Sequence, residues 1–176
     1  MSVIHVCSLK MVESLSREIR PSHVLSLLGG ITPFPPTPAG IDAANHLKMT
    51  VADISEFEPD MILPASDHMA EVIAFGHRWA KESGGKRPLL VHCFAGISRS
   101  TASTLAIACA LRPNVTEKTF AAALRMASAS AQPNSLMVRH ADELLGRSGR
   151  LRDAVQEIGP GDFSQAGQPY LLRLEV

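Results

Sequence analysis

The stretch VHCFAGISRST, residues 91–101, joins an apolar run to a polar turn and then to a second apolar run, and it decides how the rest of the chain is interpreted. Residues 88–91 lack polar alternation, which is typical of a central strand covered on both faces. Residues 102–111 are apolar nearly all round, which predicts a buried helix. The intervening loop therefore carries the chain from Cys93, at the carboxyl end of a buried strand, to Arg99 at the start of a buried helix. Open α/β sheets bind ligands at this position.

The loop between Cys93 and Arg99 has the chemistry of an anion site. Gly96 permits positive φ, and a short loop leading into a helix N-terminus can point successive N–H groups at one spot. Arg99 adds a planar guanidinium suited to bidentate contact with phosphate oxygens. The predicted phosphate-binding residues are Phe94, Ala95, Gly96, Ile97, Ser98 and Arg99. These positive surroundings are expected to lower the pKa of the Cys93 thiol, which makes Cys93 a candidate nucleophile toward phosphorus.

Strands and helices are predicted along most of the chain. Hydrophobic patterning predicts strands at residues 3–9, 24–28, 46–53 and 88–91, and helices at residues 13–20, 66–84, 102–111, 116–130 and 135–145. Ser66 or Asp67 is expected to cap the second of these helices. Four prolines between positions 33 and 38 predict an exposed, stiff loop over residues 31–40.

The alternation of strands with helices predicts an α/β fold with a small, mostly parallel central sheet flanked by helices. A chain of 176 residues without an internal repeat is expected to form a single domain over residues 1–176. Residues 148–176 are richer in glycine and weaker in pattern, so we expect a C-terminal tail that packs on the domain. Its last segment, YLLRLEV, either adds a strand or packs as a tail.

The composition limits the classes of partner. Lys plus Arg equals Asp plus Glu at 17 each, so no global field attracts nucleic acid or an anionic membrane. The three cysteines have no metal-ligand spacing, and we expect neither a metal nor another cofactor. There is no apolar run of membrane-spanning length, and the N-terminus has no basic segment ahead of its apolar run. A cytoplasmic protein is therefore expected, with its oligomeric state left open.

The stretch HCFAGISRS, residues 92–100, resembles the HC-x5-R-S/T signature of the cysteine-dependent protein tyrosine phosphatases. It is closest to their dual-specificity-like branch and to small bacterial relatives. A looser resemblance in the order of elements extends over residues 45–145. The resemblance to this family implies that the protein is a phosphomonoester hydrolase, either a protein tyrosine phosphatase or a dual-specificity phosphatase. The implied partner is a phosphorylated protein or a small phosphomonoester substrate.

The resemblance also assigns roles to individual residues. It implies that Cys93 forms a cysteinyl-phosphate intermediate and that Arg99 clamps the phosphate. The hydroxyl of Ser100 is implied to ease the breakdown of that intermediate. His92, directly before the nucleophile, is implied to organise the loop.

The leaving oxygen of a phosphomonoester needs a proton, which a carboxylic acid typically supplies. The stretch VADISEF, residues 51–57, places Asp53 directly after a predicted strand, and its D-x-x-E-F pattern resembles the acid-bearing loop of dual-specificity members. Asp53 is therefore the predicted general acid. Asp60 and Asp67 are nearer the family's usual spacing and remain alternatives, although Asp60 lies in a polar loop and Asp67 is a candidate helix cap.

Two other functions share parts of this pattern. A pseudophosphatase binds phosphoproteins without turnover, and its expected mark is loss of the nucleophile, arginine or acid. A rhodanese-type or arsenate-type enzyme also carries a cysteine on a strand-to-helix loop. In the family that the signature resembles, members that act on phosphoinositides or polyphosphates tend to carry basic residues in the signature loop. This loop has no extra basic residue, so the resemblance disfavours a highly anionic substrate. Phosphotyrosine-only members of the family have a deep pocket and an aromatic recognition loop; here the only tyrosine is Tyr170, near the C-terminus, so the resemblance favours a shallow pocket.

The remaining distinctive side chains are interpreted as structural. Cys7 and Cys109 are expected in the core, as is Trp79 on an apolar helical stripe. Histidines other than His92 are expected at the surface or in packing. Phe34 either walls the pocket or anchors the proline-rich loop.

Overall fold

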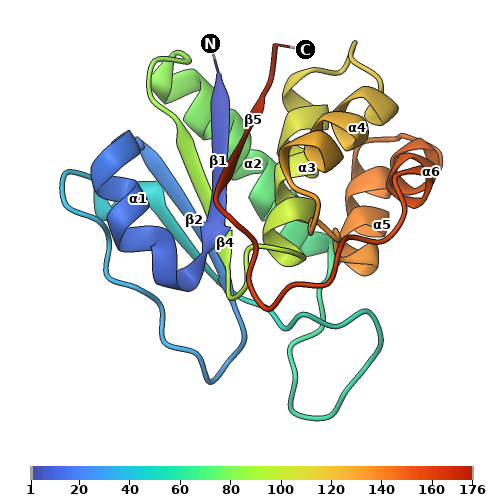
Figure 1. Ribbon diagram of the computed structural model, residues 1–176, viewed down its shortest axis with the longest axis horizontal. Helices are drawn as coiled ribbons and strands as arrows, with labels where there is room; N and C mark the ends of the chain where they lie inside the picture. Colours follow the sequence, from blue (N-terminus) through green and yellow to red (C-terminus); the bar gives the residue numbers. More distant parts are fainter. Residues whose placement is uncertain (1, 176) are drawn as a thin grey trace.

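The computed structural model describes residues 2–175 and contains a five-stranded sheet seen edge-on in Figure 1. The strands are β1 (Val3–Ser8), β2 (His23–Leu28), β3 (His46–Thr50), β4 (Leu89–Cys93) and β5 (Tyr170–Arg173). Their order is β3-β2-β4-β1-β5; β5 runs antiparallel to β1, and the other neighbours are parallel. The predicted α/β class with a mostly parallel sheet is confirmed, and the strand that ends at Cys93 is central.

Helices cover both faces of the sheet. They are α1 (Val12–Ile19), α2 (Ser66–Ser83), α3 (Arg99–Leu111), α4 (Glu117–Ala127), α5 (Ser135–Leu144) and α6 (Arg150–Glu157), with short 3-10 turns at Leu9–Met11 and Ala43–Asn45. In Figure 1, α1 lies on one side of the sheet and α2 to α6 lie on the other. Within residues 2–175, no helix is both long and apolar enough to cross a membrane.

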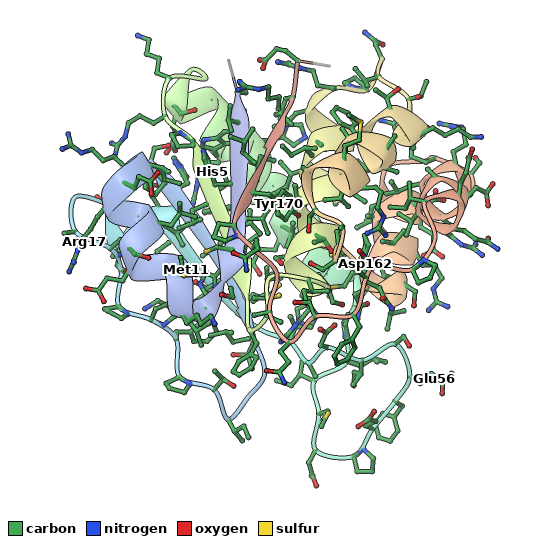
Figure 2. All side chains as sticks on the ribbon, in the orientation of Figure 1. His5, Met11, Arg17, Glu56, Asp162 and Tyr170 are labelled. Carbon is green, nitrogen blue, oxygen red and sulfur yellow. The ribbon has the colours of Figure 1, made fainter. Side chains whose placement is uncertain are left out.

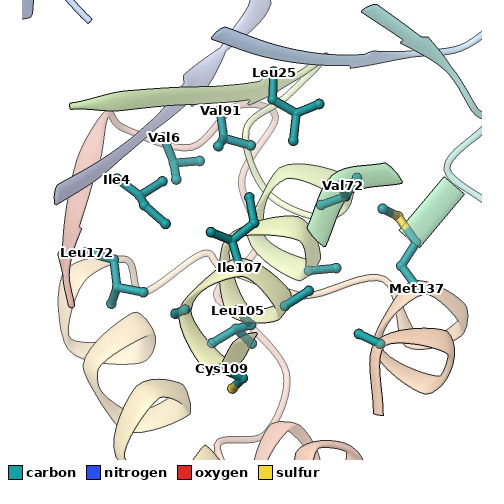
Figure 3. Packing of buried hydrophobic residues seen from close by; sticks show 14 of the residues in the cluster. Ile4, Val6, Leu25, Val72, Val91, Leu105, Ile107, Cys109, Met137 and Leu172 are labelled. Atoms are coloured by element: carbon teal, nitrogen blue, oxygen red, sulfur yellow. The ribbon is translucent and has the colours of Figure 1, made fainter. Parts of the chain in front are cut away.

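The larger hydrophobic core lies between the sheet and α2 to α6 (Figure 3). Ile4, Val6 and Val91 project from neighbouring strands toward Ile107 of α3, and all four side chains are fully buried. Burying each such side chain stabilises the fold by roughly 1.5–3 kcal/mol. Because α3 contacts the sheet and helices together, nearly all of its faces are buried, as its sequence predicted.

A smaller core lies under α1 and includes Cys7. Cys7 and Cys109 are both buried, and Trp79 is fully buried with its indole N–H donating to the carbonyl of Arg87. The core placement expected for these three side chains is therefore confirmed. Phe34 is only half-buried, in the proline-rich loop.

Two parts of the chain differ from the sequence expectations. The N-cap of α2 is Ala65, whose amide donates to the ring of His68, so neither Ser66 nor Asp67 caps this helix. The segment after residue 148 contains α6, which was not predicted because only Leu151 and Ala154 of that helix are buried and so give no periodic signal. Of the two possibilities for the last segment, the structure has the strand, β5.

Three loops meet at one edge of the sheet because β2, β3 and β4 are parallel. They are the loops of residues 29–42, 51–65 and 94–98, and they lie along the lower edge in Figure 1. The chain termini lie at the opposite edge. The predicted nucleophile, phosphate-binding loop and general acid are thereby brought to the same end of the molecule.

Candidate active site

The signature loop, residues 94–98, is held from outside through its carbonyl groups. The carbonyl of Phe94 accepts from the amide of Leu9 at 3.0 Å, and that of Ala95 from the amide of Gly167 at 2.9 Å. The carbonyl of Ile97 accepts from the amide of Gln132 at 2.9 Å, and that of Ser98 from the amide of Asn134 at 3.4 Å. In a trans peptide the carbonyl and the next N–H point in opposite directions. The amides that follow these carbonyls therefore turn toward the inside of the loop, as an anion-binding nest requires.

Gly96 lies where the loop passes the end of β1. Its φ is +75°, and a Cβ at this position would lie 2.7 Å from the carbonyl carbon of Cys7 and 2.8 Å from the amide nitrogen of Ser8. No other residue type fits this space without moving backbone. The close approach also directs the Gly96 amide to Cys93 Sγ, at 3.2 Å.

Cys93 is fully buried at the end of β4, and its sulfur has two polar neighbours. The Gly96 amide donates to Sγ, and Ser100 Oγ lies 3.2 Å from the same atom. Both neighbours are groups that can donate a hydrogen bond to the sulfur. Burial raises the pKa of the other two cysteines, Cys7 and Cys109, to about 12.

Arg99 begins α3 and holds its guanidinium inside the site, with only 7% of the side chain exposed. Nη1 donates to the carbonyl of Val51 at 2.8 Å, which fixes the side chain. Nε is buried and, within residues 2–175, makes no hydrogen bond. An unsatisfied buried N–H costs about 1–3 kcal/mol. The Arg99 guanidinium is thus fixed in place with a donor left for an incoming acceptor.

Asp53 connects three segments of the site. Its Oδ1 accepts from Ser98 Oγ at 2.6 Å and from Asn134 Nδ2 at 3.1 Å, while Oδ2 lies 3.7 Å from Arg99 Nε. Asn134, the N-cap of α5, also donates to the carbonyl of Ile54 at 3.2 Å. Oδ1 therefore accepts two hydrogen bonds, whereas Oδ2 faces the guanidinium of Arg99.

The other two candidate acids lie farther from the signature loop. Asp60 is exposed with a φ of +63°, and it lines a cavity of about 460 Å³ together with Asp53, Phe94 and Arg99. Asp67 is exposed in the first turn of α2 and lines no cavity that contains the predicted site residues. Geometry therefore favours Asp53 over Asp60, and Asp60 over Asp67.

His92 begins a chain of buried hydrogen bonds that leads away from the nucleophile. His92 Nδ1 lies 3.3 Å from the carbonyl of Cys93, and Nε2 lies 2.5 Å from Ser26 Oγ. Ser26 Oγ lies 2.7 Å from His46 Nε2, and His46 Nδ1 lies 3.0 Å from Thr37 Oγ1. This series of hydrogen bonds therefore connects Cys93 to the proline-rich loop.

The donor and acceptor groups present determine the direction of every hydrogen bond in this series. The carbonyl of Cys93 can only accept, so His92 carries its proton on Nδ1. Burial lowers the pKa of His92 and of His46 to about 4, so both rings are neutral near pH 7. Ser26 must then donate to His92 and accept from His46, which in turn accepts from Thr37. Each polar atom in the chain has a partner, as a buried network requires.

Sequence reasoning missed several of these contacts. Ser26, His46 and Thr37 had no motif to mark them, since serines and histidines occur in many buried strands. Gly167, which donates to the signature loop, lies in a tail of weak pattern. Asn134 alone had a local signal, because an asparagine before an amphipathic helix favours an N-cap. Phe34 lines neither the 460 Å³ cavity nor the groove of about 350 Å³ beside α1.

Comparison with solved structures identifies the fold. No family model and no curated protein matches the chain. DUSP15 has a solved structure similar over 93% of this chain and 94% of its own, with a TM-score of 0.61 and 25% identity. The fold is that of the dual-specificity-like cysteine phosphatases. The resemblance expected from the signature is thus confirmed, and this likeness supports a phosphatase function.

Two further solved structures have the same fold. The human tyrosine phosphatase-like serine/threonine/tyrosine-interacting protein is 17% identical, with a TM-score of 0.63 over 82% of this chain and 92% of its own. PTPMT1 in complex with PI(5)P is 16% identical, with a TM-score of 0.59 over 82% of this chain and 94% of its own. At such identities these two structures inform the fold alone.

Proposed function

We propose that this dual-specificity-like protein hydrolyses phosphomonoesters of proteins through a cysteinyl-phosphate intermediate on Cys93. The observation that carries the proposal is the fixed guanidinium of Arg99, with its buried Nε lacking a hydrogen bond, beside inward-turned loop amides and a buried sulfur. A phosphate bound there supplies the missing acceptor and places phosphorus next to the nucleophile. Cys93, Arg99, Asp53 and Ser100 carry the chemistry in this account, and His92 positions the loop.

In the first step the thiolate of Cys93 attacks phosphorus as the phosphorus–oxygen bond to the leaving group breaks. The departing oxygen takes the proton from Asp53 Oδ2, which leaves Asp53 ionised. The equatorial oxygens accept from the amides of residues 94–98 and from Arg99, whose positive charge stabilises the transition state. The contact from Val51 to Arg99 keeps the guanidinium in place throughout.

In the second step water attacks phosphorus and the phosphorus–sulfur bond breaks. Ionised Asp53 takes the proton of the attacking water and so returns to its starting state. Ser100 Oγ, 3.2 Å from Cys93 Sγ, donates to the sulfur as it leaves as a thiolate. Inorganic phosphate then departs. The residues present supply each charge and proton in this sequence, so we propose no cofactor.

We also propose a substrate class and a cellular compartment. Protein phosphotyrosine, alone or with phosphoserine and phosphothreonine, is the proposed substrate. The PI(5)P complex of PTPMT1 makes a phosphoinositide the competing substrate class. A cytoplasmic location accords with three cysteines that form no disulfide. A binding role without turnover is the second candidate, since one protein of the same fold bears the name tyrosine phosphatase-like interacting protein.

Hydrolysis of p-nitrophenyl phosphate without metal, from about pH 5 to about pH 8, tests the proposal. The wild type is compared with Cys93→Ser and Asp53→Asn. We expect a bell-shaped profile that disappears with Cys93→Ser and loses one limb with Asp53→Asn. A wild type that binds inorganic phosphate but gives no turnover would favour the binding role. Turnover of thiosulfate or arsenate instead would favour the rhodanese-type or arsenate-type alternative.

A further inference from the structure

Two cavities flank Asp53, and their walls differ in chemistry. One, of about 590 Å³, lies between residues 53–58 and residues 132–135. The other, of about 460 Å³, lies between residues 29–32 and residues 60–62 and also contains Phe94 and Arg99. Asp53 lines both cavities, so both lie next to the proposed phosphate site. A substrate that extends beyond its phosphate must lie over one or both.

The 460 Å³ cavity has an apolar rim. It is lined by Ile31, Met61, Ile62 and Phe94, and the exposed fraction of these side chains runs from 47% for Ile62 to 101% for Ile31. Exposed apolar side chains gathered at a site mark a binding surface. The aromatic ring of a phosphotyrosine and an apolar residue next to it both suit this side.

The 590 Å³ cavity is bordered by carboxylates. Glu56 and Glu58 line it, and Asp60 lies on the same loop facing the other cavity. All three are exposed, and within residues 2–175 none of them forms an ion pair. Among the described residues that line the two cavities, Arg99 is the only lysine or arginine, and its charge is directed at the phosphate.

Asp53, Glu56 and Glu58 are the charged side chains that line the 590 Å³ cavity. Figure 2 shows Glu56 on the loop that projects below the sheet, whereas Arg17 lies on the far side of α1 and pairs with Glu13. A substrate with several phosphates, or one embedded in an anionic membrane, meets repulsion from these carboxylates. A substrate with one phosphate and nearby cationic groups meets attraction.

We infer that the preferred substrate is a phosphotyrosine segment flanked by lysine or arginine. The aromatic ring packs on the apolar rim formed by Ile31, Met61, Ile62 and Phe94. The basic flanks lie against Glu56 and Glu58. This inference rests on the proposed function, because it assigns a substrate class to the same site. Exposed charge pairs are individually weak, so each carboxylate is expected to change the selectivity about 3-fold, and less at high salt.

The test uses three phosphotyrosine peptides that differ only in their flanking residues: arginine, alanine or glutamate. For the wild type at low salt, kcat/KM is expected to be about 10-fold higher with arginine flanks than with glutamate flanks. In the double variant Glu56→Gln, Glu58→Gln the ratio falls to about 1, while the alanine-flanked peptide is hydrolysed as before. The matched control Glu18→Gln, Glu71→Gln removes two exposed carboxylates on α1 and α2 and keeps the wild-type ratio.

Equal rates for the three peptides would overturn the inference, as would a ratio that survives the double variant. Faster hydrolysis of phosphatidylinositol monophosphate vesicles than of every peptide would also overturn it. Binding of the same peptides to Cys93→Ser separates recognition from turnover. If the wild type hydrolysed none of them, the proposed function would fail, and the order of these affinities would still decide the inference.

Discussion

The signature loop and the acid-bearing loop of residues 51–65 meet at Asp53 but are held in different ways. Four carbonyls of the five-residue signature loop are bound by three separate segments, and Gly96 lies against the end of β1. The acid-bearing loop is held near its ends, by the Ala52 amide bonding to the Ile62 carbonyl and by Asn134 bonding to Ile54. Between them, residues 55–61 are exposed.

This difference separates two tasks of the site. A phosphate group has one shape, so the loop that binds it gains from being fixed before the substrate arrives. The rest of a substrate varies, and the residues that meet it lie on an exposed loop with few internal bonds. Changes in the signature loop should therefore affect all substrates alike, whereas changes in residues 55–61 should affect selectivity.

The largest effect after loss of the nucleophile is expected for Arg99→Ala. Removal of the guanidinium takes away the fixed donor for phosphate oxygens and leaves the Val51 carbonyl unpaired. We expect kcat/KM to fall about 10³-fold and phosphate binding to weaken strongly, with every substrate affected to a similar degree. Steady-state kinetics and calorimetric titration with inorganic phosphate measure both. Arg99→Lys is expected to recover little, because an ammonium lacks the planar fork; near-normal kinetics in either variant would remove Arg99 from the mechanism.

The next effect is expected for Asp53→Asn. Loss of the proton donor should slow turnover by about 10²-fold for alkyl phosphates and phosphotyrosine, and less for p-nitrophenyl phosphate, whose leaving group depends less on a proton. A series of aryl phosphates with leaving groups of increasing pKa measures the dependence. Asp60→Asn is the matched control, because Asp60 lines the same cavity without contacting the signature loop. If Asp53→Asn hydrolysed phosphotyrosine normally and Asp60→Asn did not, the acid would be Asp60.

Gly96→Ala tests how tightly the signature loop is fixed. The added methyl meets the backbone of Cys7 and Ser8 and requires a left-handed φ, so we expect unfolding free energy to fall by about 2–3 kcal/mol and phosphate binding to weaken. Gly30→Ala is the control, because a Cβ there has nothing within 4 Å. Chemical denaturation of both variants gives the comparison. If the two variants had equal unfolding free energies, the signature loop would tolerate an added methyl group as well as an exposed loop does.

The smallest effect concerns pH. Burial lowers the pKa of His46 and His92 to about 4, and the charges of Lys48 and Arg99 act in the same direction. The unfolded chain therefore binds protons that the folded chain does not between about pH 6.5 and about pH 4. Stability contributed by the neutral rings is complete above about pH 6.5 and declines as the pH falls, by up to about 1.4 kcal/mol per pH unit for each ring.

His46→Gln is expected to reduce that slope by about one proton, measured by urea denaturation at a series of pH values. His77→Gln, which removes an exposed histidine of α2, serves as the control. The same acid slope in His46→Gln and the wild type would show that His46 is not held neutral.

Features formed by residues close together in the sequence could be predicted, whereas contacts between distant residues could not. The central strand, the signature loop and the buried helix are continuous in the chain, and their patterning indicated Cys93 and Arg99 correctly as neighbours of one loop. Asp53 was predicted from its position directly after a strand and from the resemblance of D-x-x-E-F to the family's acid-bearing loop, and the structure places it at the same edge. These predictions needed short-range pattern, the carboxyl-end rule for Cys93 and the family resemblance for Asp53.

The supports of the loop could not be predicted because their partners are distant in sequence. Gly167 and Asn134 reach the signature loop only after α5 and β5 have packed, and no local pattern encodes that pairing. Ser26 lies in a strand whose other neighbours are apolar, and only parallel pairing with β3 and β4 places it between His46 and His92. The short helix α6 depends on the side chain of Asp142, which accepts from the amides of Gly149 and Leu151.

Trapping the intermediate tests whether Cys93 becomes phosphorylated during turnover. Wild type, Ser100→Ala and Cys93→Ser are mixed with p-nitrophenyl phosphate, quenched in acid within one turnover and analysed by intact mass and peptide mapping. We expect one phosphoryl group on Cys93 in the wild type, more of it in Ser100→Ala because breakdown is slower, and none in Cys93→Ser. Turnover without any phosphoryl group on Cys93, or turnover that persists in Cys93→Ser, would contradict the cysteinyl-phosphate mechanism.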